Sequence, residues 1–144
     1  MEVSLSGRET AGYSGTPLAK KLGIVAGSRL FLSDAPRNYM ELVAALPEGV
    51  EVVRKIDGET DIVHIFSTAR ARLKSALRDS LGKLRQDGSI WVSWPKKSSK
   101  VPTDITEDTI REVALPMGLV DIKVCAVDEV WSGLKLVLRK KNRR

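Results

Sequence analysis

The sequence predicts a single α/β domain in which helices cover both faces of a mostly parallel sheet. Short apolar runs alternate with helical patterns along the chain, which is typical of this class. The run DIVHIF at 61–66 is almost continuously apolar, as expected of a strand that is buried on both faces. A length of 144 residues with 42% hydrophobic content suffices for one such domain, and no second domain is needed.

The first half of the chain contains two strands and two helices in this interpretation. In order, these are a helix over 18–22, a strand over 29–32, a helix over 35–46 and a strand over 50–53. Thr16 is expected to cap the first helix with Pro17 in its first turn, and Gly23 ends it. Ala35-Pro36 opens the second helix, which Pro47 and Gly49 end.

The second half continues with three strand patterns after 61–66 and two helices. In order, these are a helix from Ser67 or Thr68 to Asp87-Gly88, a strand over 89–94, a helix from Asp104 or Thr106 to Met117-Gly118, and strands over 119–127 and 134–139. In the long helix, leucines recur at spacings of four, four and three residues from Leu73 to Leu84, which predicts one apolar stripe. The turn between the last two strands is too short for a crossover, so these strands are antiparallel.

The path of the link 55–60 stays open in this interpretation, and two terminal segments lie outside the predicted domain. The segment 55–60 is short for a crossover between parallel strands, and Asp57-Gly58 could instead form a hairpin. The predicted domain covers 16–139. Residues 1–15 form a flexible Gly- and Ser-rich arm, and residues 140–144 form a solvated, disordered basic tail.

Composition argues against several classes of function. There is no apolar run near the roughly 18 residues of a membrane helix and no secretion signal, so we expect a cytoplasmic protein. Cys125 is the only cysteine and His64 the only histidine, which excludes an internal disulfide and a zinc cage. We expect both residues to be core residues, with the ring of His64 satisfied by hydrogen bonds.

Polar residues follow the strands that should run parallel, and the carboxyl ends of such strands share one edge where ligands bind. The candidate ligand-binding residues are Asp34, Arg37, Trp94, Lys96, Lys97, Asp128, Glu129 and Trp131. Catalytic residues stay unknown, because no catalytic motif is complete.

Each candidate also has a structural interpretation. Lys96 and Lys97 either hold a phosphate or carboxylate or belong to a solvated loop. If they approach Asp128 and Glu129, the group is an ion-pair latch or an acid/base site. Trp131 either stacks on a planar ligand or covers the sheet end, and Asp34 either binds or caps the next helix. The spacing of Trp91 and Trp94 predicts opposite faces, with Trp91 in the core and Trp94 at the edge. Ser132 and Gly133 are interpreted as turn residues, and Ser132 is not interpreted as a nucleophile.

The net charge of +6 is concentrated in three segments, which suggests a second kind of partner. They are the basic helix with Arg70, Arg72, Lys74, Arg78, Lys83 and Arg85, the loop Lys96–Lys100, and the tail from Arg139. These segments are either solvated surface or a weak nucleic-acid-binding module. No membrane partner is expected, and a protein partner stays unknown.

Four stretches resemble a family of small bacterial proteins of unknown function. They are GYSGTPLAKKLG (12–23), WPKK (94–97), residues 103–113 with TDIT and IREV, and GLVDIKVCAVDEVWSGLKLV (118–137). The resemblance spans nearly the whole chain and implies no established activity. The final antiparallel pair also makes the pattern similar to the Rossmann-like fold of class I methyltransferases. That resemblance implies the strand order 2-1-3-4-6-5 with the last strand antiparallel.

Class I methyltransferases carry a glycine-rich turn after their first strand that lets the backbone approach S-adenosylmethionine. The corresponding turn here reads LFLSDAPRNY, and no glycine occurs between Ser28 and Glu48. We therefore expect no cofactor and predict a binding domain rather than an enzyme, with an anionic or nucleotide-like ligand at the carboxyl edge. The alternatives are a nucleic-acid-associated basic module and a divergent methyltransferase-like transferase.

Overall fold

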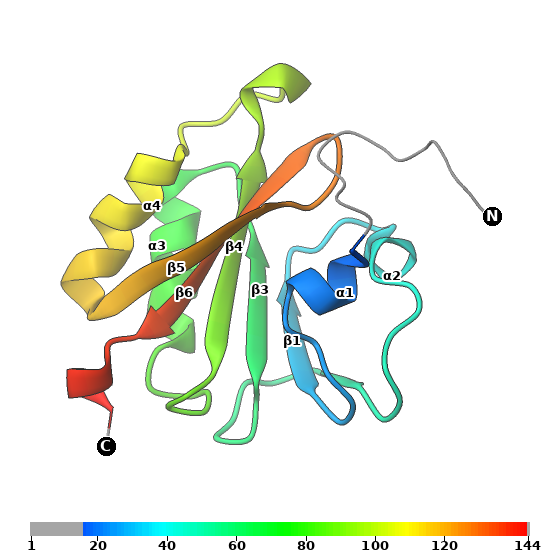
Figure 1. The fold of residues 1–144 in the computed structure, drawn as a ribbon. Helices are drawn as coiled ribbons and strands as arrows, with labels where there is room; N and C mark the ends of the chain where they lie inside the picture. The colour runs from blue at the N-terminus through cyan, green and yellow to red at the C-terminus, as the bar shows by residue number, and fades with distance from the viewer. Residues whose placement is uncertain (1–15, 144) are drawn as a thin grey trace.

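A six-stranded mixed sheet forms the centre of the molecule (Figure 1). The computed structural model describes residues 16–143, so the arm predicted over 1–15 and Arg144 lie outside the described residues. The strands are β1 (Arg29–Ser33), β2 (Glu51–Val53), β3 (Ile62–Phe66), β4 (Ser89–Pro95), β5 (Leu119–Ala126) and β6 (Trp131–Leu138). Their order is β2-β1-β3-β4-β6-β5, and β6 runs antiparallel to both of its neighbours. The predicted order is confirmed.

Helices cover both faces of the sheet, and each face has its own apolar core. The helices are α1 (Leu18–Lys21), α2 (Tyr39–Leu42), α3 (Arg70–Ser80) and α4 (Glu107–Ala114), with single 3-10 turns at Lys97–Ser99, Leu115–Met117 and Lys140–Asn142. Figure 1 shows α3 and α4 on one side and α1 and α2 on the other. All five residues of β3 are buried, and alternate side chains join the two cores. Trp91 and Trp94 also point to opposite cores, as predicted.

The helices next to the carboxyl edge are shorter than predicted. The helix expected from Ala35 begins at Tyr39 after Asn38, so Asp34 does not cap it, and only one turn forms. Pro47 disfavours helical backbone at the residue before it, which limits how far the helix can run. The helix α3 ends at Ser80 rather than at Asp87-Gly88, because Gly82 adopts a left-handed φ of 81°.

The caps of the helices differ in part from those predicted. The N-cap of α1 is Pro17 rather than Thr16, and that of α3 is Ala69 rather than Ser67 or Thr68. The N–H of Arg70 in the first turn of α3 instead donates to Asp104 Oδ1 at 2.7 Å, 34 residues away. Thr106 caps α4 by accepting from the N–H of Thr109 at 3.1 Å, which confirms one of the two predicted caps.

The link between β2 and β3 is a crossover without a helix. Both strands pair in parallel with β1, one on each side, so the alternative hairpin at Asp57-Gly58 is wrong. Ile56 packs against the core beside α3 and covers part of the sheet that a crossover helix would cover. Eight residues, 54–61, therefore suffice to cross one strand, with a bend at Arg54-Lys55 and a turn closed by the hydrogen bond from the N–H of Thr60 to Asp57 O at 2.9 Å.

The closing hairpin is longer than predicted, since β6 begins at Trp131 instead of Leu134. Ser132 and Gly133 therefore belong to the strand, and their interpretation as turn residues is wrong. A Cβ atom on Gly133 would lie 3.2 Å from the ring of Trp91, so a glycine here lets that ring pack against the backbone. The predicted disorder of the tail is also wrong up to Arg143, because Lys140–Asn142 form a 3-10 turn and Asn142 Nδ2 donates to Gly118 O at 3.3 Å.

Candidate functional site at the carboxyl edge

The loop after β4 and the turn between β5 and β6 lie together at one edge of the sheet. The N–H of Lys96 donates to the carbonyl of Val130 at 2.7 Å, and Pro95 is paired with Trp131 in the ladder. Figure 1 shows both segments at the same end of the sheet. The predicted convergence of the two groups, which stand about thirty residues apart in the sequence, is therefore confirmed.

Hydrogen bonds within the loop fix the backbone that carries the two lysines. Ser99 Oγ donates to the carbonyl of Lys96 at 2.6 Å and accepts from the N–H of Val101 at 3.2 Å. The N–H of Lys100 closes the 3-10 turn on the carbonyl of Lys97, with Lys100 in the left-handed region. This backbone presents a half-buried Lys96 and an exposed Lys97 at a set position before any ligand arrives.

The two carboxylates of the turn have different surroundings. Asp128 Oδ1 accepts from the N–H groups of Val130 and Trp131 at 2.8 and 2.7 Å, so this side chain shapes the turn. Glu129 is exposed. Across residues 16–143, no ion pair within 4.0 Å joins Lys96 or Lys97 to either carboxylate, and the ion-pair latch does not form in this structure.

The other predicted site residues are distributed unevenly around the edge. Asp34 and Arg37 are exposed beyond the end of β1, two strands away from β4. Asp34 adopts a φ of 56°, a conformation that favours glycine and that Asp tolerates better than most residues. Trp94 is only 8% exposed and packs in the core beside α3 and α4, so little of its ring is accessible to a ligand.

Trp131 connects the edge to a buried aromatic and polar cluster that the sequence did not predict. Its ring meets Phe66 edge-on with centroids 5.1 Å apart, and Phe66 stacks on His64 at 4.4 Å. Tyr39 Oη lies 2.9 Å from His64 Nδ1, and Ser93 Oγ lies 2.7 Å from His64 Nε2. The position of Trp131 is thus set by side chains from β3, and those side chains are in turn fixed by hydrogen bonds across the sheet.

The Ser93–His64 pair is structural, although a serine next to a histidine is also the arrangement of a nucleophile and its base. Both residues are 0% exposed, so no substrate can reach the hydroxyl. Burial lowers the pKa of His64 to about 3 and raises the pKa of Tyr39 above its usual range. The imidazole is therefore neutral and uses one nitrogen as donor and the other as acceptor. This confirms the predicted core histidine.

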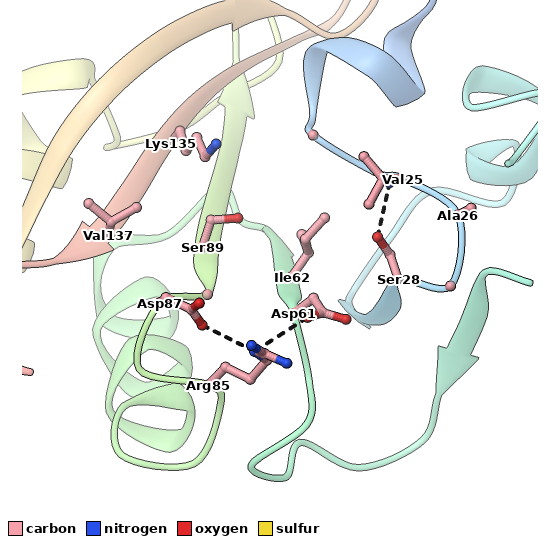
Figure 2. Close-up of a pocket in the computed structure, with 13 residues that line it drawn as sticks. Val25, Ala26, Ser28, Asp61, Ile62, Arg85, Asp87, Ser89, Lys135 and Val137 are labelled. Carbon is pink, nitrogen blue, oxygen red and sulfur yellow. Dashed lines mark hydrogen bonds and ion pairs between the residues drawn. The ribbon is translucent and has the colours of Figure 1, made fainter. Parts of the chain in front are cut away.

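A cavity of about 480 Å³ lies at the opposite, amino edge of the sheet and was not predicted (Figure 2). Its walls come from the loop before β1, the starts of β3 and β4, and the end of β6. Figure 2 shows Ser89 and Lys135 projecting from β4 and β6 into this space, with the ion pairs of Arg85 below them. No local motif signals the cavity, because its walls are separated by more than a hundred residues, from Gly23 to Val137.

The basic segments do not form one compact surface. The loop Lys96–Lys100 lies at the carboxyl edge, whereas the tail lies at the amino edge, where Asn142 contacts Gly118 (Figure 1). Between the edges, Arg70, Lys74 and Arg78 of α3 line a cavity of about 430 Å³ against α4. Among the described residues, no group of three or more metal-ligating side chains is close enough to hold a metal ion, and no helix could cross a membrane.

Comparison with known proteins identifies a family and a fold. The family model described as "Protein of unknown function (DUF3052)" matches residues 48–140. No curated protein matches the chain. A SAM-dependent methyltransferase from Aquifex aeolicus is similar in structure, with a TM-score of 0.57 and 13% identity over 83% of this chain and 86% of that one. A candidate type 11 methyltransferase from Sulfolobus solfataricus has a TM-score of 0.53 and 11% identity over 88% and 92% of the two chains. At these identities the likeness concerns the fold alone.

Proposed function

The chain belongs to the DUF3052 family of proteins of unknown function, and we propose that it is a small binding domain for an anionic or nucleotide-like ligand. The site is the carboxyl edge of the methyltransferase-like sheet, between the Lys96–Lys97 loop and the turn that ends at Trp131. The observation that carries the proposal is the 2.7 Å hydrogen bond from Lys96 to Val130, which holds the two segments side by side.

The chemistry of this edge suits a ligand with a negative charge and a flat ring. Lys96 and Lys97 have no carboxylate partner within 4.0 Å among residues 16–143, so their ammonium groups are available to phosphate or carboxylate oxygens. Trp131 is half-buried and held edge-on by Phe66, which leaves part of a rigid indole surface for stacking. Glu129 is exposed at the same turn, and its carboxylate would accept hydrogen bonds from hydroxyl or amino groups of the ligand.

The loop after β1 does not fit S-adenosylmethionine in the way the methyltransferase resemblance implies. Asp34 has a left-handed φ and an exposed side chain at the position where a glycine would leave the backbone accessible. Pro36 and Arg37 add further bulk to the same approach. A divergent transferase is therefore the less favoured alternative.

The nucleic-acid alternative is supported by the row of Arg70, Lys74 and Arg78 on α3. These cations stand four residues apart on one helix face and flank a cavity, so they could follow a line of phosphates. The distance between the carboxyl-edge loop and the tail argues against a single extended nucleic-acid interface.

A thermal-shift screen tests the proposal directly. Nucleoside mono- and diphosphates, S-adenosylmethionine and S-adenosylhomocysteine are each added to the wild-type chain and to the variants Lys97→Ala and Glu129→Ala. A ligand present at 100 times its Kd stabilises the folded state by about 2.7 kcal/mol, which is a measurable rise in Tm. Lys74→Ala on α3 is the matched control, since it removes the same charge away from the site.

We expect a nucleotide to raise the Tm of the wild type and of Lys74→Ala, and to raise that of Lys97→Ala much less. The variants themselves should melt close to the wild type, because neither side chain has an ion pair to lose. If no nucleotide raises the wild-type Tm, or if Lys97→Ala responds as the wild type does, the carboxyl-edge site is wrong.

A further inference from the structure

We propose that the cavity at the amino edge is a second binding site, in which Lys135 and Ser89 hold the phosphate of a small hydroxylated phosphate ester. This site is separate from the carboxyl edge and does not depend on the function proposed above. Its residues come from the loop 23–28 before β1, from residues 61–62 where β3 begins, from the turn 85–88, and from β4 and β6 (Figure 2).

Ser89 places its hydroxyl group at the wall of the cavity. The residue is only 8% exposed and its backbone N–H donates to Asp61 O at 3.0 Å, but its hydroxyl oxygen is not among the fully buried, unpaired atoms of residues 16–143 and stays accessible from the cavity. The hydroxyl is not sealed off, and Figure 2 shows it directed into the cavity. A hydroxyl group in this position can donate a hydrogen bond to an oxygen of a ligand that enters the cavity, or accept one from it.

Lys135 adds a positive charge that no side chain neutralises. It is half-buried, and no carboxylate lies within 4.0 Å of its ammonium group among residues 16–143. In the ladder it is paired with Lys123, so two like charges stand opposite each other on neighbouring strands. Such pairs are destabilising, and an anion beside them would remove the repulsion. A Cβ on Gly23 would lie 3.7 Å from Lys135 Nζ, which places the ammonium group at the wall formed by the loop.

The opposite wall carries groups that recognise hydroxyls rather than a second anion. Arg85 Nε lies 3.1 Å from Asp87 Oδ1 and 3.6 Å from Asp61 Oδ1, and these contacts orient both carboxylates along the cavity. Asp61 Oδ2 accepts from the N–H of Arg29 at 2.8 Å, so Asp87 is the carboxylate with an oxygen still available to a ligand. Beside Asp87, the remaining N–H groups of Arg85 are donors for the same hydroxyl groups.

These walls define the class of ligand. A phosphate dianion suits the wall formed by β4 and β6, which carries Ser89 and Lys135, and hydroxyl groups suit the other wall, where Asp87 accepts hydrogen bonds. A volume of about 480 Å³ is in the range of small-molecule sites. The lining contains no aromatic ring to stack on a base, so a sugar phosphate fits better than a nucleotide.

Calorimetry with ribose 5-phosphate as the probe tests the proposal, with ribose and inorganic phosphate as its two halves. We expect ribose 5-phosphate to bind the wild type, ribose not to bind, and phosphate to bind more weakly than the ester. Lys135→Gln should weaken binding of the ester at least about tenfold, since a charge-assisted contact is lost, and Ser89→Ala should weaken it several-fold. Lys97→Ala at the carboxyl edge should bind as the wild type does.

The melting temperatures distinguish a site from a structural role. Because Lys135 has no partner and faces Lys123, Lys135→Gln should melt at or above the wild-type temperature. A fall of several degrees, an unchanged affinity for ribose 5-phosphate in this variant, or no binding to the wild type at millimolar concentration would each overturn the proposal. Equal losses of affinity for ribose 5-phosphate in Lys97→Ala and Lys135→Gln would also contradict the proposal. The first three results leave nucleotide binding at the carboxyl edge untouched, whereas equal losses of affinity in the two variants would indicate that the sugar phosphate also contacts that edge.

Discussion

The buried hydrogen-bonded side chains of Tyr39, His64 and Ser93 should make the protein lose stability in mild acid. Burial lowers the pKa of His64 to about 3, whereas an unfolded histidine titrates near 6.5. Between these values the unfolded chain binds a proton that the folded chain does not. The free energy of unfolding is therefore highest above about pH 6.5 and falls as pH drops through this window.

The expected slope is about 1.4 kcal/mol for each pH unit, so the step from pH 6.5 to pH 4.5 costs roughly 2 kcal/mol. The full sequence has one histidine, so no other imidazole contributes. The hydrogen bond from Arg85 lowers the pKa of Asp87, and the stability linked to that carboxylate is lost only at more acidic pH, below its ordinary value near 3.9.

Urea unfolding at half-unit pH steps from 7.5 to 4.5 measures the slope. His64→Gln keeps a donor and an acceptor but cannot titrate, so its stability should be nearly flat over the same range. Tyr39→Phe removes one hydrogen bond but retains the imidazole, so it should be less stable at every pH and keep the slope. A wild-type curve that is flat between pH 6.5 and 4.5 would refute the reasoning, as would an unchanged slope in His64→Gln.

Three further predictions concern the cofactor, nucleic acid and a helix cap. Calorimetry should show S-adenosylmethionine binding no tighter than about 1 mM because of the bulk after β1, and a micromolar constant would contradict this. Association with nucleic acid should be weak, fall steeply with salt and be lost when the chain ends at Leu138, so tight binding that survives this truncation would favour the alternative function. Thr106→Ala should reduce the free energy of unfolding by about 1 kcal/mol in urea titrations, whereas Thr106→Ser should not.

Local patterns predicted the features that depend on neighbouring residues. The apolar run of β3 and the cap at Thr106 followed from residue type and spacing, whereas the order of the strands was implied by the resemblance to class I methyltransferases. The meeting of the Lys96 loop with the turn at Val130 also followed, because parallel strands bring their carboxyl ends to one edge.

Features that depend on distant partners were missed. The first turn of α3 is capped by Asp104, and nothing near Ser67 in the sequence reveals that. His64 was expected in the core, but its partners Tyr39 and Ser93 are 25 and 29 residues away. The sequence does not distinguish the helixless crossover at 54–61 from a hairpin, because the length of a segment alone does not fix the path of the chain. Nothing in the sequence indicated the cavity at the amino edge, since Ser89 and Lys135 line the same cavity only after β4 and β6 have paired.

The most direct test of the carboxyl-edge site is a nuclear magnetic resonance titration of the ¹⁵N-labelled chain with adenosine diphosphate. The indole N–H of Trp131 and the backbone amides of Lys96 and Lys97 should shift together and saturate at one Kd. The indole N–H of Trp91 donates to Leu22 O at 2.9 Å in the core, and its resonance should not shift. If the resonances of Trp131, Lys96 and Lys97 do not shift at millimolar nucleotide, the proposal that this edge is a ligand site is contradicted.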